Sequence, residues 1–82
     1  MNNKRYRLCV IEKTQNLEYR VEHELFDIDE EYSTLKEAKE NYSIFKDSNG
    51  SNYQLVGIFD NVKDKFVELS VLSNNNDWKK IK

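Results

Sequence analysis

The chain contains no proline and only two glycines among its 82 residues. This composition excludes collagen, proline-rich recognition segments and the glycine-rich loops that bind phosphate. Cys9 is the single cysteine and cannot form a disulfide within the chain, and its apolar neighbours predict a reduced, buried thiol. His23 is the single histidine, so zinc sites built from clustered cysteines and histidines are excluded as well.

The chain also lacks a long hydrophobic run. Its first apolar stretch covers only residues 8–11 and is followed by Glu12. A signal peptide needs a longer apolar region, and a membrane-spanning helix needs about 20 apolar residues. We therefore expect a cytoplasmic protein with no membrane partner.

Neither sign of charge is in large excess. Thirteen Lys and Arg stand against fifteen Asp and Glu, which gives a formal net charge of −2. Electrostatic binding to nucleic acid usually begins from a cationic surface, so nucleic acid is not the expected partner. The short length predicts one domain over residues 1–82, because a second domain could not bury a core of its own.

Two segments near the start show the alternation that is typical of β-strands. Residues 5–12 carry apolar side chains on both faces, which predicts a central strand. Residues 17–26 predict a half-buried strand, joined to the first as a hairpin. Its outer face would carry Glu18, Arg20, Glu22 and Glu24. The acidic segment 27–33 is expected to be a loop.

Residues 35–46 predict a helix of about three turns. Thr34 and Glu37 form a capping box, in which the Thr34 hydroxyl accepts from the Glu37 amide and the Glu37 side chain reaches back. The apolar stripe of the helix consists of Leu35, Ala38, Tyr42 and Phe45. We expect the helix to stop at Asn49 or Gly50.

Two more strands are expected at residues 53–60 and 66–72, where alternation returns. The tail, residues 73–82, begins with a polar run. After that run, Trp78 and Ile81 are expected to pack back through a final helical turn.

Together these elements predict an α+β fold in the order β-β-α-β-β. The two strands that are apolar on both faces belong in the middle, so the four-stranded antiparallel sheet has the expected order 2-1-3-4, with the helix packed on one face. The helix stripe is expected to pack on Leu8, Val10, Val21, Leu69 and Val71. The other face would keep an apolar patch, a feature that marks a partner surface or a homodimer contact. This patch would contain Cys9, Ile11, Val56, Ile58 and Phe66.

Motifs for metal binding and catalysis are missing. The acidic run at residues 27–31 is like the start of a calcium loop, but Tyr32 stands where that loop needs Gly and Ala38 where it needs Glu. Cys9 and His23 would lie on paired strands, yet apolar surroundings would raise the pKa of the thiol and favour simple packing. No pair of carboxylates stands out, and the chain is too small to enclose a deep pocket. We therefore expect no catalytic residue, no metal ligand, no cofactor and no enzymatic activity.

The strongest charge feature is the acidic segment between residues 18 and 31. The predicted partner-binding residues are Glu18, Glu22, Glu24, Asp29, Glu30 and Glu31, with Tyr19 and Tyr32 as aromatic anchors. On one face of a strand, the first three carboxylates would be about 7 to 14 Å apart. Phosphates follow one another at about 7 Å along a nucleic-acid strand, so such a row can imitate a backbone and bind a basic groove on a protein. The alternative interpretation is an ordinary solvated strand face.

A second hypothesis rests on the two ends of the chain. Basic residues gather at Lys4, Arg5 and Arg7 and again at Lys79, Lys80 and Lys82, beside Trp78. If the ends converge, they form a basic spot with a stacking ring, as in proteins that bind single strands. The chain would then be a small nucleic-acid-binding protein. Otherwise these residues are solvated ends that aid solubility.

In size, acidity and richness in Asn and Lys, the whole chain resembles small proteins encoded by phages and mobile elements of low-GC bacteria. Anti-CRISPR and other anti-defence proteins belong to that group. The resemblance implies an inhibitor that occupies a host protein's nucleic-acid channel with carboxylates. It rests on composition and assigns no role to any single residue. The resulting hypothesis is a non-enzymatic, acidic protein-binding module.

Overall fold

The computed structural model describes residues 4–48 and 52–82. This part of the chain forms five strands and two helices. In chain order they are β1 (Tyr6–Glu12), α1 (Leu17–Glu22), β2 (Asp27–Tyr32), α2 (Leu35–Ser48), β3 (Tyr53–Asp60), β4 (Lys65–Leu72) and β5 (Trp78–Lys80). Neither helix within the described ranges has the length and apolar character that crossing a membrane requires.

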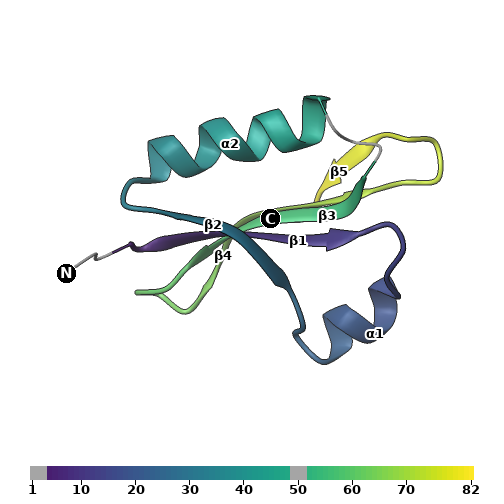
Figure 1. Cartoon of the computed structure of the whole chain (residues 1–82), viewed down its shortest axis with the longest axis horizontal. Coiled ribbons are helices and arrows are strands. Elements are labelled where there is room, and N and C mark those ends of the chain that lie inside the picture. Colours follow the sequence, from purple (N-terminus) through teal and green to yellow (C-terminus); the bar gives the residue numbers. More distant parts are fainter. Residues whose placement is uncertain (1–3, 49–51) are drawn as a thin grey trace.

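The strands form one antiparallel sheet in the order β2-β1-β3-β4-β5. Helix α2 lies over one side, which we call the first face, and α1 lies on the opposite side, at the second face (Figure 1). The α+β class and the antiparallel sheet confirm the prediction from the sequence. The expected four strands and single helix are wrong, because the structure adds β5 at one edge and α1 on the second face.

Strands β1 and β3 form the centre of the sheet. Leu8 pairs with Ile58 and Val10 with Val56, and all four are buried beneath α2. The residues between them, such as Cys9, face the other side because side chains alternate along a strand. The expectation that Val56 and Ile58 lie on the open face is therefore wrong: the register with β1 places both on the first face.

Helix α2 begins where the sequence predicts. The Glu37 amide donates a hydrogen bond to the Thr34 hydroxyl oxygen at 3.2 Å, which satisfies one amide of the first turn. The same hydroxyl donates to Glu37 Oε1 at 3.1 Å, so the glutamate binds the capping side chain in place of the expected backbone amide. The helix runs to Ser48, and the expected stop at Asn49 or Gly50 lies outside the described residues.

The stripe of α2 packs on the first face as predicted. Ala38 and Tyr42 are buried in the core cluster, and Leu35 and Phe45 pack against it. The Tyr42 hydroxyl shares a hydrogen bond with the buried hydroxyl of Ser70 on β4, so the polar tip of the tyrosine has a partner inside the core.

Residues 17–26 do not form the predicted strand. The Asn16 side chain accepts a hydrogen bond from the Tyr19 amide at 3.0 Å and caps the start of α1. At the other end, the Leu25 amide donates to the Arg20 carbonyl oxygen at 2.8 Å, and Glu24 takes a φ of 54°. This left-handed residue completes a Schellman motif, in which glycine is the usual choice.

Local capping explains why the strand prediction fails there. The apolar residues of this segment alternate, which favoured a strand, but none of the residues of α1 is buried. The alternation therefore does not correspond to a buried sheet face. Val21, expected in the core under the main helix, belongs to α1 and is 44% exposed.

The acidic segment expected as a loop is instead strand β2, at the edge of the sheet. All its residues except Tyr32 are exposed. An edge strand on a half-covered sheet needs no apolar pattern of its own, because backbone hydrogen bonds to β1 hold it in place. The pairing shifts between Leu8 and Cys9, which leaves Asp29 as an extra residue in a β-bulge.

A second bulge decides which side of β4 faces α2. The pairing of β3 with β4 shifts between Ile58 and Phe59, and Val67 is left as the extra residue. Val67 packs against the core under α2, but the residues beyond the bulge have the opposite phase. Leu69 and Val71 therefore lie on the second face, and the expectation that they pack under the helix is wrong.

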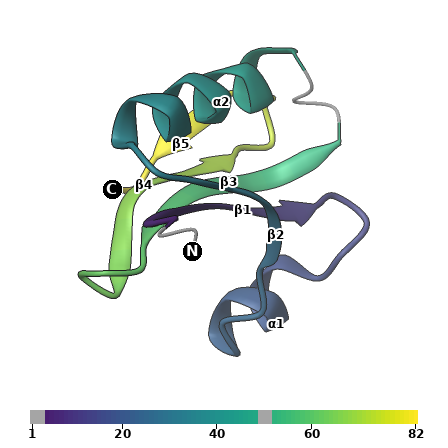
Figure 2. The same cartoon turned by 60° about the vertical axis from the view of Figure 1, so that its left-hand side comes forward.

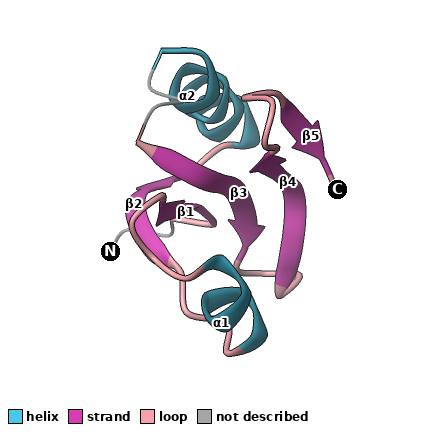
Figure 3. Cartoon of the chain, turned by 90° about the vertical axis from the view of Figure 1, so that its right-hand side faces the viewer, coloured by secondary structure: helices cyan, strands magenta, loops and turns pink. Residues whose placement is uncertain are grey.

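The tail ends in a strand, so the expected final helical turn is wrong. Strand β5 pairs with the end of β4 and forms the second edge of the sheet (Figure 3). Trp78 packs against the core, and its indole N–H donates to the Lys46 carbonyl oxygen of α2 at 2.9 Å. Ile81 stays 58% exposed, so of the two residues only Trp78 packs back as expected.

Candidate functional site

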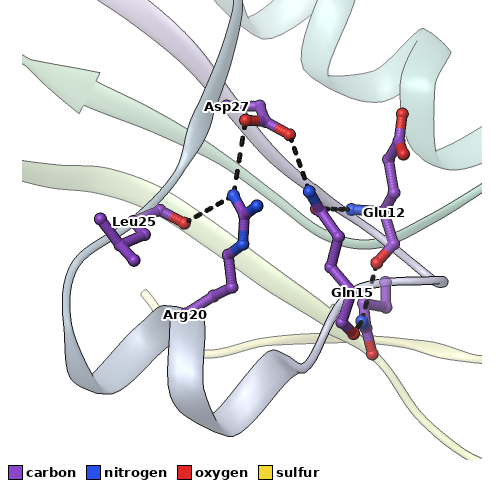
Figure 4. A network of polar contacts seen from close by, with 6 residues as sticks. Glu12, Gln15, Arg20, Leu25 and Asp27 are labelled. Carbon is purple, nitrogen blue, oxygen red and sulfur yellow. Dashed lines mark hydrogen bonds and ion pairs between the residues drawn. The ribbon is translucent and has the colours of Figure 1, made fainter.

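The connection from β1 through α1 to β2 carries half of the predicted site residues, and β2 carries the other half. A polar network holds the connection in place (Figure 4). Gln15 accepts a hydrogen bond from the Glu12 amide at 2.9 Å and donates to Asp27 Oδ2 at 3.3 Å. Arg20 reaches Asp27 Oδ1 and the Leu25 carbonyl oxygen, each at 3.5 Å. Asp27, the first residue of β2, is thereby bonded to α1 through Arg20. Helix α1 lies below the sheet (Figure 2).

The structure divides the predicted acidic face into separate parts. Glu18 and Glu22 lie four residues apart on α1, so they occupy one side of the helix about one turn, or roughly 6 Å, apart. Glu24 follows the helix at the left-handed position. All three are exposed, and within residues 4–48 and 52–82 none of them forms an ion pair. The continuous row expected on a strand is therefore absent from this segment.

The remaining predicted carboxylates lie on the edge strand β2. Glu31 is paired with Arg7 on β1 at 3.3 Å. Asp29 and Glu30 have no cationic partner among the described residues. Partial burial raises the pKa of Asp29 above its usual value, and the neighbouring Glu30 charge raises it further. Lys4 lines the same shallow hollow as Asp29 and Glu30 but forms no ion pair with either of them. The two carboxylates of this part of the edge are therefore unpaired in the described part of the chain.

The two predicted aromatic anchors have different surroundings. Tyr19 on α1 is 55% exposed and lies 4.4 Å from the His23 ring, measured between centroids. Tyr32 packs against the core cluster under α2. Burial raises the pKa of Tyr32, and the charges of Glu30, Asp29 and Glu37 add to that effect. Tyr32 therefore contributes to the fold beside the acidic edge, whereas Tyr19 offers a free aromatic surface.

The second face holds a hollow of about 610 Å³, between α1 with its connection to β2 and the neighbouring strands. We call it the second-face hollow. Its apolar lining includes Cys9, Phe26, Phe59, Phe66 and Leu69, and Val21 and Ile28 form its sides. Phe66 packs edge-on against both Phe26 and Phe59, with ring centroids 5.2 Å apart in each pair. Phe26 thus links the α1 connection to the sheet.

Close packing of the hollow's base depends on Gly57. A Cβ atom at this position would lie 2.7 Å from the Leu69 side chain and 3.0 Å from the Phe66 ring. The absence of a side chain therefore lets these two residues lie flat on β3. The sequence pattern indicated Cys9 and Phe66 on this face, but it did not indicate Leu69, whose phase is set by the bulge.

Charged residues surround the second-face hollow unevenly. Glu24 lies on the α1 side, and Lys65 and Lys82 lie on the side of β4 and the end of the chain. Asp64 precedes Lys65, and Arg7 is already paired with Glu31. The rim is therefore acidic toward α1 and mainly basic toward β4.

Cys9 and His23 are the residues that the sequence offered for nucleophilic or metal chemistry. Burial raises the pKa of the Cys9 thiol to about 11, so the thiol stays protonated near neutral pH. His23 is exposed at the end of α1. Among the residues described, no three His, Cys, Asp or Glu side chains gather closely enough to hold a metal ion.

Three of the six basic residues at the chain ends, Arg5, Arg7 and Lys80, form ion pairs within the described part of the fold. Arg5 is bound to Asp60 at 2.9 Å, and Lys80 to Glu68 at 2.9 Å. The Trp78 ring is packed against the core, with its N–H already bonded. The ends converge only in that Arg7 and Lys82 line the same hollow, so no basic spot with a free stacking ring is formed by these residues.

Comparisons of the chain with models of protein families, with curated proteins and with solved structures find no match. Any functional interpretation therefore starts from the two surfaces described above, the acidic edge of β2 and the second-face hollow.

Proposed function

We propose that this chain is a non-enzymatic protein-binding module whose acidic edge strand binds a basic, nucleic-acid-binding surface of a protein partner. In this role it competes with nucleic acid for that surface. The chain's resemblance in size and composition to anti-defence proteins of phages and mobile elements favours an inhibitor of a host protein.

The observation that carries the proposal is the pair Asp29 and Glu30 on β2. Both are exposed, they follow one another at the bulge, and within the described chain neither is paired with a cation. Their mutual repulsion contributes to the raised pKa of Asp29. A cationic partner would relieve this repulsion, which is the electrostatic complementarity that directs association between proteins.

The position of the pair also suits binding. An edge strand is accessible from outside the sheet, and its bulge and charges oppose strand-to-strand aggregation. Glu18 and Glu22 add a second, separate group of carboxylates on α1, and Tyr19 is an exposed aromatic side chain on the same helix. Aromatic side chains next to charged contacts are common among the residues that dominate binding energies.

The test uses a fluorescent oligo-arginine peptide as a stand-in for a basic groove, with binding followed by anisotropy at several salt concentrations. We expect binding that weakens as salt rises, since exposed charges beyond about 8 Å are screened at physiological ionic strength. The variant Asp29→Asn with Glu30→Gln should weaken binding by roughly tenfold, equivalent to about 1.4 kcal/mol. A DNA duplex, which competes for the peptide, should release the protein.

The matched control is Glu40→Gln with Asp47→Asn, which removes two exposed carboxylates from α2. Its net charge equals that of the Asp29→Asn, Glu30→Gln variant. This control should bind nearly as well as the natural chain. Equal loss in both variants would show general charge attraction and contradict a site on β2. Direct binding of a single-stranded oligonucleotide by the protein would instead support the nucleic-acid hypothesis.

A further inference from the structure

We infer that the second-face hollow is the contact surface of a homodimer, in which two copies meet face to face about a two-fold axis. This inference is independent of the proposed function, because the Asp29 and Glu30 side chains do not line the hollow.

The first argument is the apolar surface that this face leaves uncovered. Phe26, Phe59, Phe66 and Leu69 each keep part of their surface exposed, although they line the hollow. At its side, Ile28 is 49% exposed. On the first face, by contrast, α2 buries the central strands. Contiguous apolar surface of this kind marks a site of association in a small protein.

The second argument is the charge on either side of the hollow, which identifies a second copy as the occupant. Glu24 lines the hollow on the α1 side, and Glu22, the last residue of α1, precedes it by two positions without lining the hollow. Lys65 and Lys82 lie on the β4 side. None of these four forms an ion pair with another residue of the described part. Asp64 reduces the positive charge of the β4 side but does not reverse its sign.

A two-fold axis through the hollow converts this asymmetry into complementarity. In an isologous contact the same surface is used by both copies. With the two-fold axis in the contact plane and perpendicular to the line from α1 to β4, the α1 side of each copy faces the β4 side of the other. Glu24 and Glu22 of one copy would then meet Lys65 and Lys82 of its partner twice, while the apolar linings cover each other. A foreign partner would need its own matching pair of opposite charges. A second copy supplies both by symmetry.

The test is sedimentation velocity over a wide range of protein concentration, at low and at high salt. We expect the mass to rise from 9.8 kDa toward twice that value as concentration increases. Ile28→Asp places a charge in the apolar contact and should raise the dissociation constant by about tenfold or more. Val62→Asp is the matched control, because Val62 is a 71% exposed apolar residue that does not line the hollow.

Charge reversal provides a second measurement that does not depend on the apolar variant folding. Lys65→Glu with Lys82→Glu should weaken the dimer, and adding Glu22→Lys with Glu24→Lys should restore it. Circular dichroism checks that each variant keeps its fold. Recovery in the fourfold variant would indicate a symmetric contact. In such a contact the α1 side of one copy, now basic, again faces the β4 side of the other copy, now acidic.

Several outcomes would overturn the inference. They are a monomer at every concentration, a dimer that tolerates both Ile28→Asp and the lysine reversals, and a dimer that Val62→Asp disrupts equally. A monomer that still binds the oligo-arginine peptide through Asp29 and Glu30 would leave the proposed function standing. Loss of peptide binding with an intact dimer would contradict the proposed function and leave the dimer inference standing.

Discussion

Asp60 ends β3 with only 1% of its surface exposed, yet it remains charged because its carboxylate is surrounded by donors. Arg5 donates to both carboxylate oxygens at 2.9 Å, and the amides of Val62 and Lys63 donate to Oδ1. The bond from Arg5 is the largest cause of a pKa lowered to about 2. A buried charge with this many partners fixes the start of the chain against the β3–β4 turn.

Asp60 should therefore make stability depend on pH in the acidic range. An unfolded aspartate has a pKa of about 3.9. Because the folded pKa is lower, the contribution is fully present above that value and is lost as pH falls toward about 2. Unfolding by urea, measured from neutral pH down through this window, should show the loss. The dependence of the free energy of unfolding on pH should be weaker in Asp60→Asn. It should persist in Asp64→Asn, which removes an exposed carboxylate four residues away.

At the scale of elements, α2 could be predicted from sequence because two independent signals agree. The stripe from Leu35 to Phe45 is buried where its period places it, and Thr34 caps the helix as its spacing to Glu37 indicates. The centre of the sheet was predictable for a similar reason, since β1 and β3 are apolar on both faces. In these elements local pattern and burial give the same answer.

Helix α1 and strand β2 could not be predicted because burial does not determine either of them. The Asn16 side chain caps the start of α1, and the left-handed Glu24 lets backbone hydrogen bonds close its end. The alternating residues of α1 are not buried. Strand β2 is polar because it lies at an edge. The sequence indicated that the predicted carboxylates are exposed. It did not indicate that they divide between α1 with the residue Glu24 after it and strand β2. Likewise, the phase of Leu69 depends on a bulge at Val67, which no sequence period indicates.

The cap of α2 gives a prediction at this scale. Thr34→Ala should lower the free energy of unfolding by about 1 kcal/mol, because the Glu37 amide loses its side-chain acceptor. Ser33→Ala is the control and should change stability much less, since the described cap uses Thr34. Chemical denaturation of both variants measures the difference. A larger effect at Ser33 would mean that the helix begins one residue earlier in solution.

At the scale of the whole molecule, the two faces of the sheet are covered very differently. Helix α2 has 14 residues, buries its stripe and is joined to β4 through Tyr42 and Ser70 and to β5 through Trp78. Helix α1 has six residues, none of them buried. A helix this short is not stable by itself in water. Its position depends on the Asp27 network and on Phe26, at the side of an open hollow.

This inequality should appear in amide hydrogen exchange, measured at a concentration where the chain is monomeric. The amides of His23 and Leu25, which follow α1 and donate to its Tyr19 and Arg20 carbonyl oxygens, should exchange through local opening. Amides of β1 and β3 should exchange only when the whole sheet unfolds. Tyr42→Phe, which removes the hydroxyl bonded to Ser70, should therefore speed exchange in the central strands and leave α1 nearly unchanged.

The opposite pattern would have a clear structural meaning. If the α1 amides were as slow as those of β1 and accelerated equally in Tyr42→Phe, α1 would unfold together with the core, and the second face would be as tightly packed as the first. If the amides of α1 exchange rapidly in the monomer, the same exchange experiment at higher protein concentration becomes a second test of the dimer. A partner copy on the second-face hollow would hold Glu24 and the α1 connection in place, so α1 protection should rise with concentration while β1 and β3 change little. In that case α1, whose amides exchange fastest in the monomer, is the element that dimerisation stabilises.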